Sequence, residues 1–230
     1  MKKIIAIVCA VLAFALAFGS GVALLMQYLD TRNSSESFEQ LAEKIAEVTE
    51  PVAPVEGTAE TAEEALAQTK YGALFYENQD FVGWISIEGT NVNYPVMQTP
   101  NEPDYYLKHN FKKRHSDYGV PYVDEACMLG ISNNVVIYGH NMKDGSMFAD
   151  TCEYKRKSFY EEHKIICFDT RFTIDEYEVV AMFKYNVNNE TFKFNAYTTM
   201  DEAEFDEFME NVRARQLYDT GVDIEYGISC

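Results

Sequence analysis

Hydrophobic and polar positions divide the chain into an apolar N-terminal run, a polar connecting stretch and a long region of short alternating segments. Residues 4–29 carry no charge, and the apolar part through Met26 is 23 residues long, enough to span a bilayer as a helix. Lys2 and Lys3 precede this run and acidic residues follow it, a pattern that places the N-terminus in the cytoplasm. We therefore predict an uncleaved, single-pass signal anchor at residues 1–29, held in the cell membrane through residues 4–29, with the catalytic part of the chain extracellular.

A cleaved signal peptide is the alternative for this run. Ala15-Leu16-Ala17 has the small residues of a cleavage site. Phe18 and residues 22–26 continue the apolar run beyond that site, which favours retention of the anchor.

Residues 30–69 form a predicted acidic stalk, rich in Glu, Ala, Thr and Ser and interrupted by Pro51 and Pro54. Four apolar residues before the prolines recur at helical spacing and predict a short amphipathic helix that separates the domain from the membrane. They are Phe38, Leu41, Ile45 and Val48. Helical character resumes at residues 63–79, where four residues are candidates to dock on the following domain: Leu66, Tyr71, Leu74 and Phe75.

Beyond residue 80 the pattern changes to short β-rich runs bounded by turn residues, which predicts a mainly β domain with peripheral helices at 70–230. The predicted strands cover residues 81–87, 92–97, 119–123, 134–138, 164–173, 177–185 and 192–194. One late helix is predicted from a capping box formed by Thr199 and Glu202. Its apolar face consists of Phe205, Phe208, Met209 and Val212.

Composition then narrows the possible partners. The chain has 19 basic and 37 acidic residues and a formal net charge of −18, so nucleic acid would be repelled and anionic lipid headgroups are disfavoured. A peptide or a cationic surface remains compatible with this charge.

Cysteine spacing matches no zinc motif, and we expect no metal and no organic cofactor. Cys9 lies in the predicted anchor. Cys127, Cys152 and Cys167 are interpreted as buried small apolar residues or as part of one disulfide bridge. Only Cys230 has an argued chemical role.

That role depends on His140, in the pentapeptide Tyr138-Gly139-His140-Asn141-Met142, which closes the apolar run at 135–137. A cysteine thiolate can attack an acyl group while an imidazolium protonates the leaving group. His140 and Cys230 are therefore the candidate catalytic residues. The other histidines, His109, His115 and His163, are expected to be solvated polar residues.

Four segments of this chain resemble the class B sortases, the membrane-anchored cysteine transpeptidases of Gram-positive bacteria. The resemblance runs from about residue 70 to the end. The segments are Asn78-Gln79-Asp80-Phe81-Val82-Gly83-Trp84-Ile85, Gly89-Thr90-Asn91-Val92-Asn93-Tyr94-Pro95-Val96-Met97-Gln98, Asp104-Tyr105-Tyr106-Leu107 and Tyr138-Gly139-His140-Asn141-Met142-Lys143-Asp144-Gly145-Ser146-Met147-Phe148.

The resemblance implies a closed β-barrel with peripheral helices, in which His140 matches the histidine that protonates the departing amine. It implies cleavage of a sorting motif of the Asn/Ser/Pro-Pro-x-Thr type near the C-terminus of a secreted protein. The acyl group would then be joined to a peptidoglycan cross-bridge amine of the cell wall. Residues 185–200 and the helix after them match the loop that lines the substrate groove.

The end of the chain departs from the family pattern, which is Thr-Leu-x-Thr-Cys followed by an arginine on the next strand. This chain ends Tyr226-Gly227-Ile228-Ser229-Cys230. The separation of 90 positions from His140 favours Cys230 as the nucleophile. The local register is about six residues short, which at about 3.3 Å per residue would leave Cys230 about 20 Å from the site. Cys230 as a chance residue at a truncated end is therefore the alternative.

The family's arginine has no counterpart, because Arg171, Arg213 and Arg215 lie on an earlier strand and on the late helix. A terminal carboxylate would also oppose formation of a Cys230 thiolate. These departures predict impaired catalysis and a barrel that lacks its final strand or strands, with an unpaired edge. Two alternatives follow: an inactive, sortase-like module that binds peptides, and a pilin-polymerising sortase.

Overall fold

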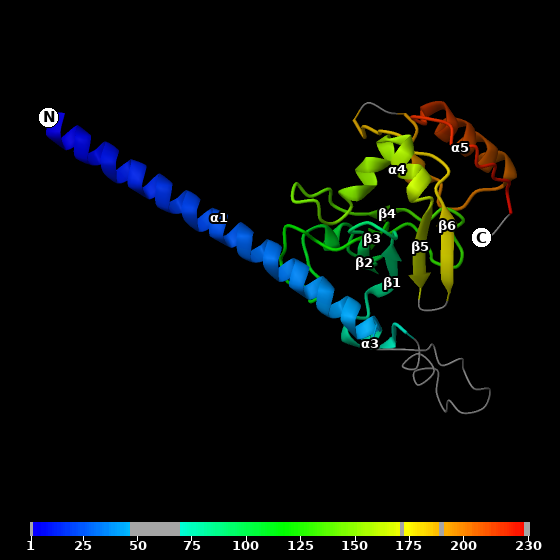
Figure 1. Ribbon diagram of the computed structural model, residues 1–230, viewed down its shortest axis with the longest axis horizontal. Coiled ribbons are helices and arrows are strands. Elements are labelled where there is room, and N and C mark those ends of the chain that lie inside the picture. The colour runs from blue at the N-terminus through cyan, green and yellow to red at the C-terminus, as the bar shows by residue number, and fades with distance from the viewer. Residues whose placement is uncertain (1, 47–69, 171–172, 189–190, 228–230) are drawn as a thin grey trace.

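One long helix, α1 (Lys2–Ala46), runs through the predicted anchor and into the predicted stalk without a break. The computed structural model describes residues 2–46, 70–170, 173–188 and 191–227, with side chains from residue 16 onward except at 23 and 27. The N-terminal half of α1 projects away from the domain, and its C-terminal part lies against it (Figure 1). No helix in the described part of the chain is long and apolar enough to cross a membrane; the side chains of residues 1–15, where much of the predicted anchor falls, lie outside that part.

The C-terminal part of α1 packs on the domain through the predicted amphipathic face. Phe38, Leu41 and Ile45 are buried, and the Phe38 ring meets the Tyr94 ring edge-on at 5.1 Å between centroids. Burial of each such side chain contributes about 1.5–3 kcal/mol. Residues 38–45 therefore form a docked helix, and Val48 lies outside the described residues.

The strands form one six-stranded sheet with the order β4-β3-β2-β1-β5-β6. All neighbouring pairs are antiparallel except β2 and β3, which are parallel. The strands are β1 (Phe81–Ser86), β2 (Asn93–Met97), β3 (Tyr122–Val123), β4 (Ile137–Tyr138), β5 (Ile165–Thr170) and β6 (Ile174–Glu178). The first five lie within the strands predicted at 81–87, 92–97, 119–123, 134–138 and 164–173.

The last two strand predictions are wrong. The hairpin turns at Thr170 and Thr173, whose backbones are joined by a 2.8 Å hydrogen bond, so β6 begins before the predicted strand at 177–185 and ends at Glu178. Beyond β6, the carbonyls of Val180 and Met182 accept hydrogen bonds from residues 220 and 217 instead of a strand. At 192–194, Phe192 is buried beside the Phe208 ring and a short 3-10 helix, η3 (Phe194–Ala196), replaces the strand.

The described strands form an open sheet with β4 and β6 as its two edges, and not the closed barrel that the resemblance implies; an unpaired edge agrees with the predicted loss of the final strand or strands. Ile174 at the start of β6 is 67% exposed. Asp175, Glu176 and Glu178 lie on the same strand, and such charges oppose pairing with other chains at an exposed edge.

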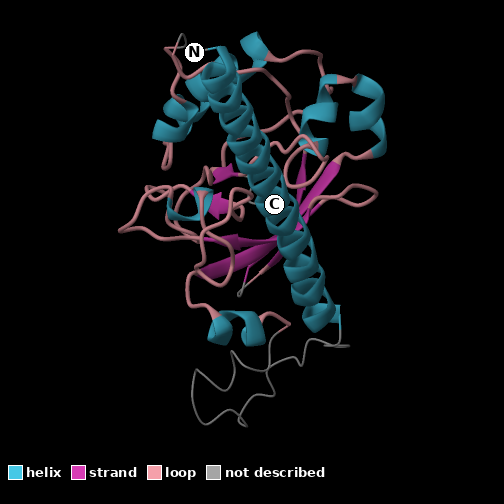
Figure 2. Cartoon of the chain, turned by 90° about the vertical axis from the view of Figure 1, so that its left-hand side faces the viewer, coloured by secondary structure: helices cyan, strands magenta, loops and turns pink. Residues whose placement is uncertain are grey.

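The helices lie around the sheet, with α3 at one end of the domain and α4 and α5 at the other (Figures 1 and 2). Their bounds are α3 (Gly72–Glu77), α4 (Lys157–Glu162) and α5 (Glu202–Arg215), with 3-10 helices η1 (Tyr105–Leu107) and η2 (Asp150–Lys155). The docking predicted for the segment at 63–79 is confirmed at Tyr71 and Leu74, which are buried, and at Phe75, which packs on the core; Leu66 lies outside the described residues.

Helix α5 begins two residues later than predicted. Its N-cap is Asp201, whose side chain accepts from the Glu204 backbone at 2.9 Å, while Glu204 accepts from the Asp201 backbone at 3.0 Å. The capping box is therefore Asp201 with Glu204, and the prediction of Thr199 with Glu202 is wrong. The predicted apolar face is confirmed, with Val212 buried and the remaining members half-buried.

Candidate functional site

His140 follows β4 directly, separated from the strand by Gly139 alone. Its ring is half-buried, and Nε2 lies 2.8 Å from the backbone oxygen of Leu107. Because a carbonyl only accepts, Nε2 carries the proton in this contact, and Nδ1 of the neutral ring is left as an acceptor. The imidazole is thus held in one orientation at the end of the strand, with a ring nitrogen available for proton transfer.

Leu107 is placed by a rigid segment between β2 and β3. It ends η1, in which Tyr106 is fully buried and its hydroxyl donates to Asp80 at 2.8 Å. The side-chain amide of Asn78 donates to the Tyr106 hydroxyl at 2.9 Å and to the Phe111 carbonyl at 2.7 Å. This network fixes the carbonyl on which His140 rests.

Gly139 is required by the ring of Phe148. A Cβ built at residue 139 would lie 2.4 Å from Phe148 Cδ2, well inside van der Waals contact. The Phe148 amide in turn donates to the His140 carbonyl at 2.8 Å, and Asn141 pairs with Met147. The segment after His140 therefore folds back on itself as a closed loop, residues 140–148.

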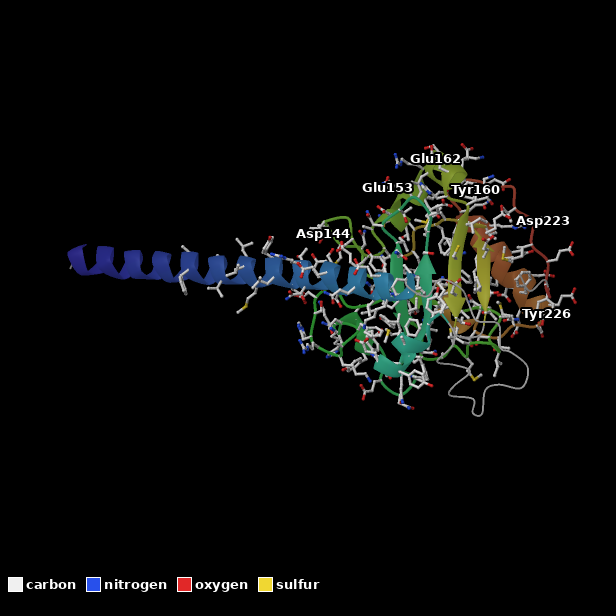
Figure 3. The ribbon with its side chains drawn as sticks, turned by 60° about the horizontal axis from the view of Figure 1, so that its bottom comes forward. Asp144, Glu153, Tyr160, Glu162, Asp223 and Tyr226 are labelled. Carbon is white, nitrogen blue, oxygen red and sulfur yellow. The ribbon has the colours of Figure 1, made fainter. Side chains whose placement is uncertain are left out.

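Asp144 links this loop to α1. Its carboxylate accepts from the backbone and hydroxyl of Ser146, at 3.0 and 2.6 Å, and from the Tyr118 hydroxyl. The Thr31 hydroxyl on α1 is 2.6 Å from the Tyr118 oxygen, and it is the donor because Tyr118 donates to Asp144. Burial opposes ionisation of Asp144, but these hydrogen bonds outweigh it and hold its pKa below the usual value. Figure 3 shows Asp144 beside α1, where the helix meets the domain.

The segment predicted to line the substrate groove is held beside β4. The Asn134 side chain donates to the Phe194 carbonyl at 3.1 Å, and Asn133 exchanges two hydrogen bonds with the Met200 backbone. Asn195 also reaches the Tyr138 hydroxyl at 3.4 Å, two residues before His140. The chain at 194–200 therefore neighbours the His140 strand, and sequence reasoning had not identified Asn133 and Asn134 as its anchors.

The other histidines differ in part from their prediction as solvated residues. His109 is half-buried, stacks on Tyr105 at 4.0 Å and bonds to its carbonyl. His163 is half-buried and lies 2.8 Å from the Glu88 carbonyl. His115 is exposed, as predicted.

Three cysteines are described and all are free. Cys127 is buried, and burial raises the pKa of its thiol. Cys167 is half-buried, with its pKa raised for the same reason. Cys152, which the sequence left without a role, accepts from the Asn141 side chain at 3.2 Å and so contacts the residue after His140.

Cys230 lies outside the described residues, so its pairing with His140 stays a prediction. Tyr226, four positions earlier, packs against Phe205 of α5 and donates to the Met200 carbonyl at 3.1 Å. In Figure 3 it lies on the opposite side of the domain from Asp144.

The two described arginines of α5 are engaged locally, as expected for helix charges. Arg213 pairs with Asp223 at 3.0 Å, and Arg215 bonds to Asn211 and lies over the Phe192 ring. Arg171 lies outside the described residues. Among the residues that the structure describes, no cluster of His, Cys, Asp and Glu could hold a metal ion.

Two cavities, of about 540 and 530 Å³, lie between α1 and the domain. The first is lined by Phe38, Tyr94 and the loop at 144–147, and the second by Leu24, Tyr28 and Asn141 among others. His140 lines neither of them, so these cavities are separate from the candidate catalytic group.

The sortase domain family matches residues 85–211 of this chain. Sortase B of Listeria monocytogenes is 32% identical over 148 residues, which cover 64% of this chain and 58% of that protein. Sortase B of Staphylococcus aureus is 24% identical over 225 residues, covering 97% of this chain and 86% of that protein.

The fold gives the same result as the sequence matches. A solved Staphylococcus aureus sortase B–substrate complex superimposes with a TM-score of 0.71, covers 86% of this chain and 85% of that one, and is 24% identical. The open sheet, the histidine at the end of β4 and the family match at 85–211 support the same assignment. The chain belongs to the sortase family of cysteine transpeptidases, and its relatives place it in class B.

Proposed function

We propose that this chain acts as a transpeptidase that cuts a sorting motif in a secreted protein and joins the new acyl end to a peptidoglycan amine. The observation that carries this proposal is His140 at the end of β4, oriented by the Leu107 carbonyl, within the segment that matches the sortase domain. A fixed imidazole whose free ring nitrogen can take up the proton of the cysteine thiol suits its later transfer to a departing amine.

The proposed reaction has two halves. The Cys230 thiol first passes its proton to the free Nδ1 of His140. The thiolate then attacks the carbonyl carbon of the motif's threonine, the peptide C–N bond breaks, and the His140 imidazolium gives the Nδ1 proton to the leaving amine. An acceptor amine then attacks the thioester, loses a proton to His140 and releases the thiolate. No external oxidant, reductant or metal is needed.

Peptide recognition is assigned to the segment at 185–200. The part of this segment at 194–200 lies next to β4, held by Asn133 and Asn134, which supports a groove that ends near His140. The substrate complex solved for the Staphylococcus aureus relative supports a peptide as the ligand.

Location at the membrane is also proposed. The uncharged run at 4–29 supports insertion of this part of α1, with residues 70–230 on the extracellular side. Leu24, Leu25 and Met26 are each more than half exposed, which supports an apolar surround for this part of the helix.

The test is intact-mass analysis of the full chain in detergent after incubation with a sorting-motif peptide. A thioacyl adduct that maps to Cys230, and that an added oligoglycine amine removes as a peptide product, supports the proposal. A Cys152→Ser variant is the matched control and should form the same adduct. Peptide binding without any adduct would identify a binding module and overturn the proposal.

A further inference from the structure

The segment at 108–116 is a basic island in an acidic protein. It holds Lys108, Lys112, Lys113 and Arg114 and no acidic residue, although the chain has 37 acidic and 19 basic residues. The net negative charge of the protein predicts that anionic surfaces repel it, but the interaction also depends on which charged residues face that surface. Whether this segment can contact an anionic surface therefore depends on where it lies in the fold.

The segment is a turn held by internal hydrogen bonds, and its basic residues are exposed. The Asn110 side chain accepts from the backbones of Lys112 and Arg114, at 3.0 Å each, and the Ser116 amide donates to the Lys108 carbonyl at 2.9 Å. Phe111 is buried beneath the turn, 1% exposed. We refer to residues 108–116 as the basic turn.

Two of its charges are neutralised and two are not. Lys108 pairs with Asp117 at 2.9 Å, and Lys113 pairs with Asp80 at 2.8 Å. Lys112 and Arg114 are exposed and form no ion pair with any residue that the structure describes.

The basic turn adjoins α1 where its apolar run ends. The Asp117 amide donates to the Asp30 carboxylate at 2.9 Å, and Asp30 is the first charged residue after the uncharged stretch at 4–29. Met26, the end of the apolar run, is four residues away, or about 6 Å along the helix. If this run occupies a bilayer, the basic turn lies at the level of the headgroups.

The loop at 140–148 places another basic side chain, Lys143, near the end of the apolar run of α1. Lys143 is exposed and unpaired among the described residues, and it lines the cavity that contains Leu24 and Tyr28 of α1. Tyrosine and lysine side chains beside apolar residues are typical of membrane–water interfaces. The described apolar side chains of α1 at 24–26 and 28–29 are each between 46% and 66% exposed, an apolar surface of the kind that marks a membrane contact.

We propose that the basic turn and Lys143 form a docking surface for anionic lipid headgroups, which holds the domain against the leaflet from which α1 emerges. This rests on the proposed insertion of residues 4–29, not on catalysis. Each unpaired basic side chain near an anionic surface contributes roughly fivefold to the docking equilibrium. Docking would set the orientation of the domain, including the His140 loop that Tyr118 ties to α1.

The test uses the full chain in nanodiscs of neutral phosphatidylcholine, and in nanodiscs with about 30% phosphatidylglycerol. Amide exchange of residues 108–116 should slow about tenfold in the anionic discs, and 0.5 M salt should abolish the difference because surface charges are screened. Lys112→Gln with Arg114→Gln should remove the protection. Lys184→Gln with Lys193→Gln removes the same charge from exposed positions between β6 and α5 and should retain it.

Two results would overturn the proposal in distinguishable ways. Failure of the chain to co-purify with discs of either composition would exclude membrane insertion and, with it, this surface. Stable insertion with equal exchange of the basic turn in both lipids would exclude the docking surface alone, whatever the transpeptidase assay shows.

Discussion

Replacement of Gly139 by alanine should shift the His140 loop through one contact. The added Cβ would lie 2.4 Å from Phe148 Cδ2 and 2.7 Å from its Cγ and Cε2, so the ring or the strand end must move. Overpacking of this kind costs about 1–3 kcal/mol. Alanine also restricts the unfolded chain, which offsets about 0.4–1 kcal/mol of that cost. These two terms together give a net loss of roughly 0–2.6 kcal/mol, and the middle of that range is about 1.3 kcal/mol.

A double-mutant cycle isolates the contact. Phe148→Ala removes a half-buried ring and has its own cost, but it also removes the atoms that a methyl group introduced at residue 139 would strike. Gly139→Ala should therefore be neutral or stabilising by up to about 1 kcal/mol in the Phe148→Ala background, with a coupling of about 1 kcal/mol or more.

Urea unfolding followed by circular dichroism gives the four free energies, provided that the m-values agree among the variants. Additive costs would refute the reasoning, since they would show that the methyl group at residue 139 does not meet the Phe148 ring. A large loss for Gly139→Ala in both backgrounds would point instead to a backbone constraint.

Three further outcomes are expected. Asp201→Ala should cost about 0.5–2 kcal/mol in urea unfolding through loss of the α5 cap, whereas Thr199→Ala should leave stability unchanged within error. Burial raises the pKa of Asp144, but its hydrogen bonds outweigh burial and lower the pKa overall. Its contribution to stability is therefore complete above an unfolded pKa near 4 and is lost as the pH falls through the lower folded pKa. Asp144→Asn should flatten the dependence of stability on pH in that acid range. Iodoacetamide at pH 8 should modify Cys152 before Cys127, whose pKa is raised by burial, and peptide mapping that finds the reverse order would contradict the described burial.

The sheet could be predicted from the sequence where strands are bounded by turn residues, as at β1 and β2. The error at β6 arose because residues 177–185 form an apolar run rich in β-branched and aromatic residues, which is typical of a strand, while the chain after Glu178 bonds to residues 217 and 220. That pairing is long-range and leaves no local signal. The continuity of α1 was missed because the charge at Asp30 was taken as a boundary, although no glycine or proline interrupts the helix between 30 and 46.

The start of α5 shows why local rules can be ambiguous. Both Thr199 with Glu202 and Asp201 with Glu204 fit a capping pattern. The Met200 amide donates to Asn133 at 2.9 Å and its carbonyl accepts from Tyr226, which holds residue 200 outside the helix. Tertiary contacts thus selected the second cap.

The candidate site likewise contains features that the sequence predicts and features that it does not. His140 could be identified from its motif, because a short apolar run followed by Gly-His at a strand end is a local feature. The chain of hydrogen bonds from Thr31 through Tyr118 to Asp144 joins residues 87 and 26 positions apart, so no spacing in the sequence predicts it. The basic turn was visible as a sequence cluster, but its proximity to α1 was not.

The most direct test of the account is the rate at which the His140→Ala variant transfers a sorting peptide to an oligoglycine amine. His115 is exposed, and His115→Ala serves as the matched control. Because general acid–base catalysis contributes about 10²–10⁴-fold, the account predicts that wild type and His115→Ala transfer at similar rates and that His140→Ala is at least about 100-fold slower. Full transfer by His140→Ala, or no transfer by the wild-type chain, would contradict the account.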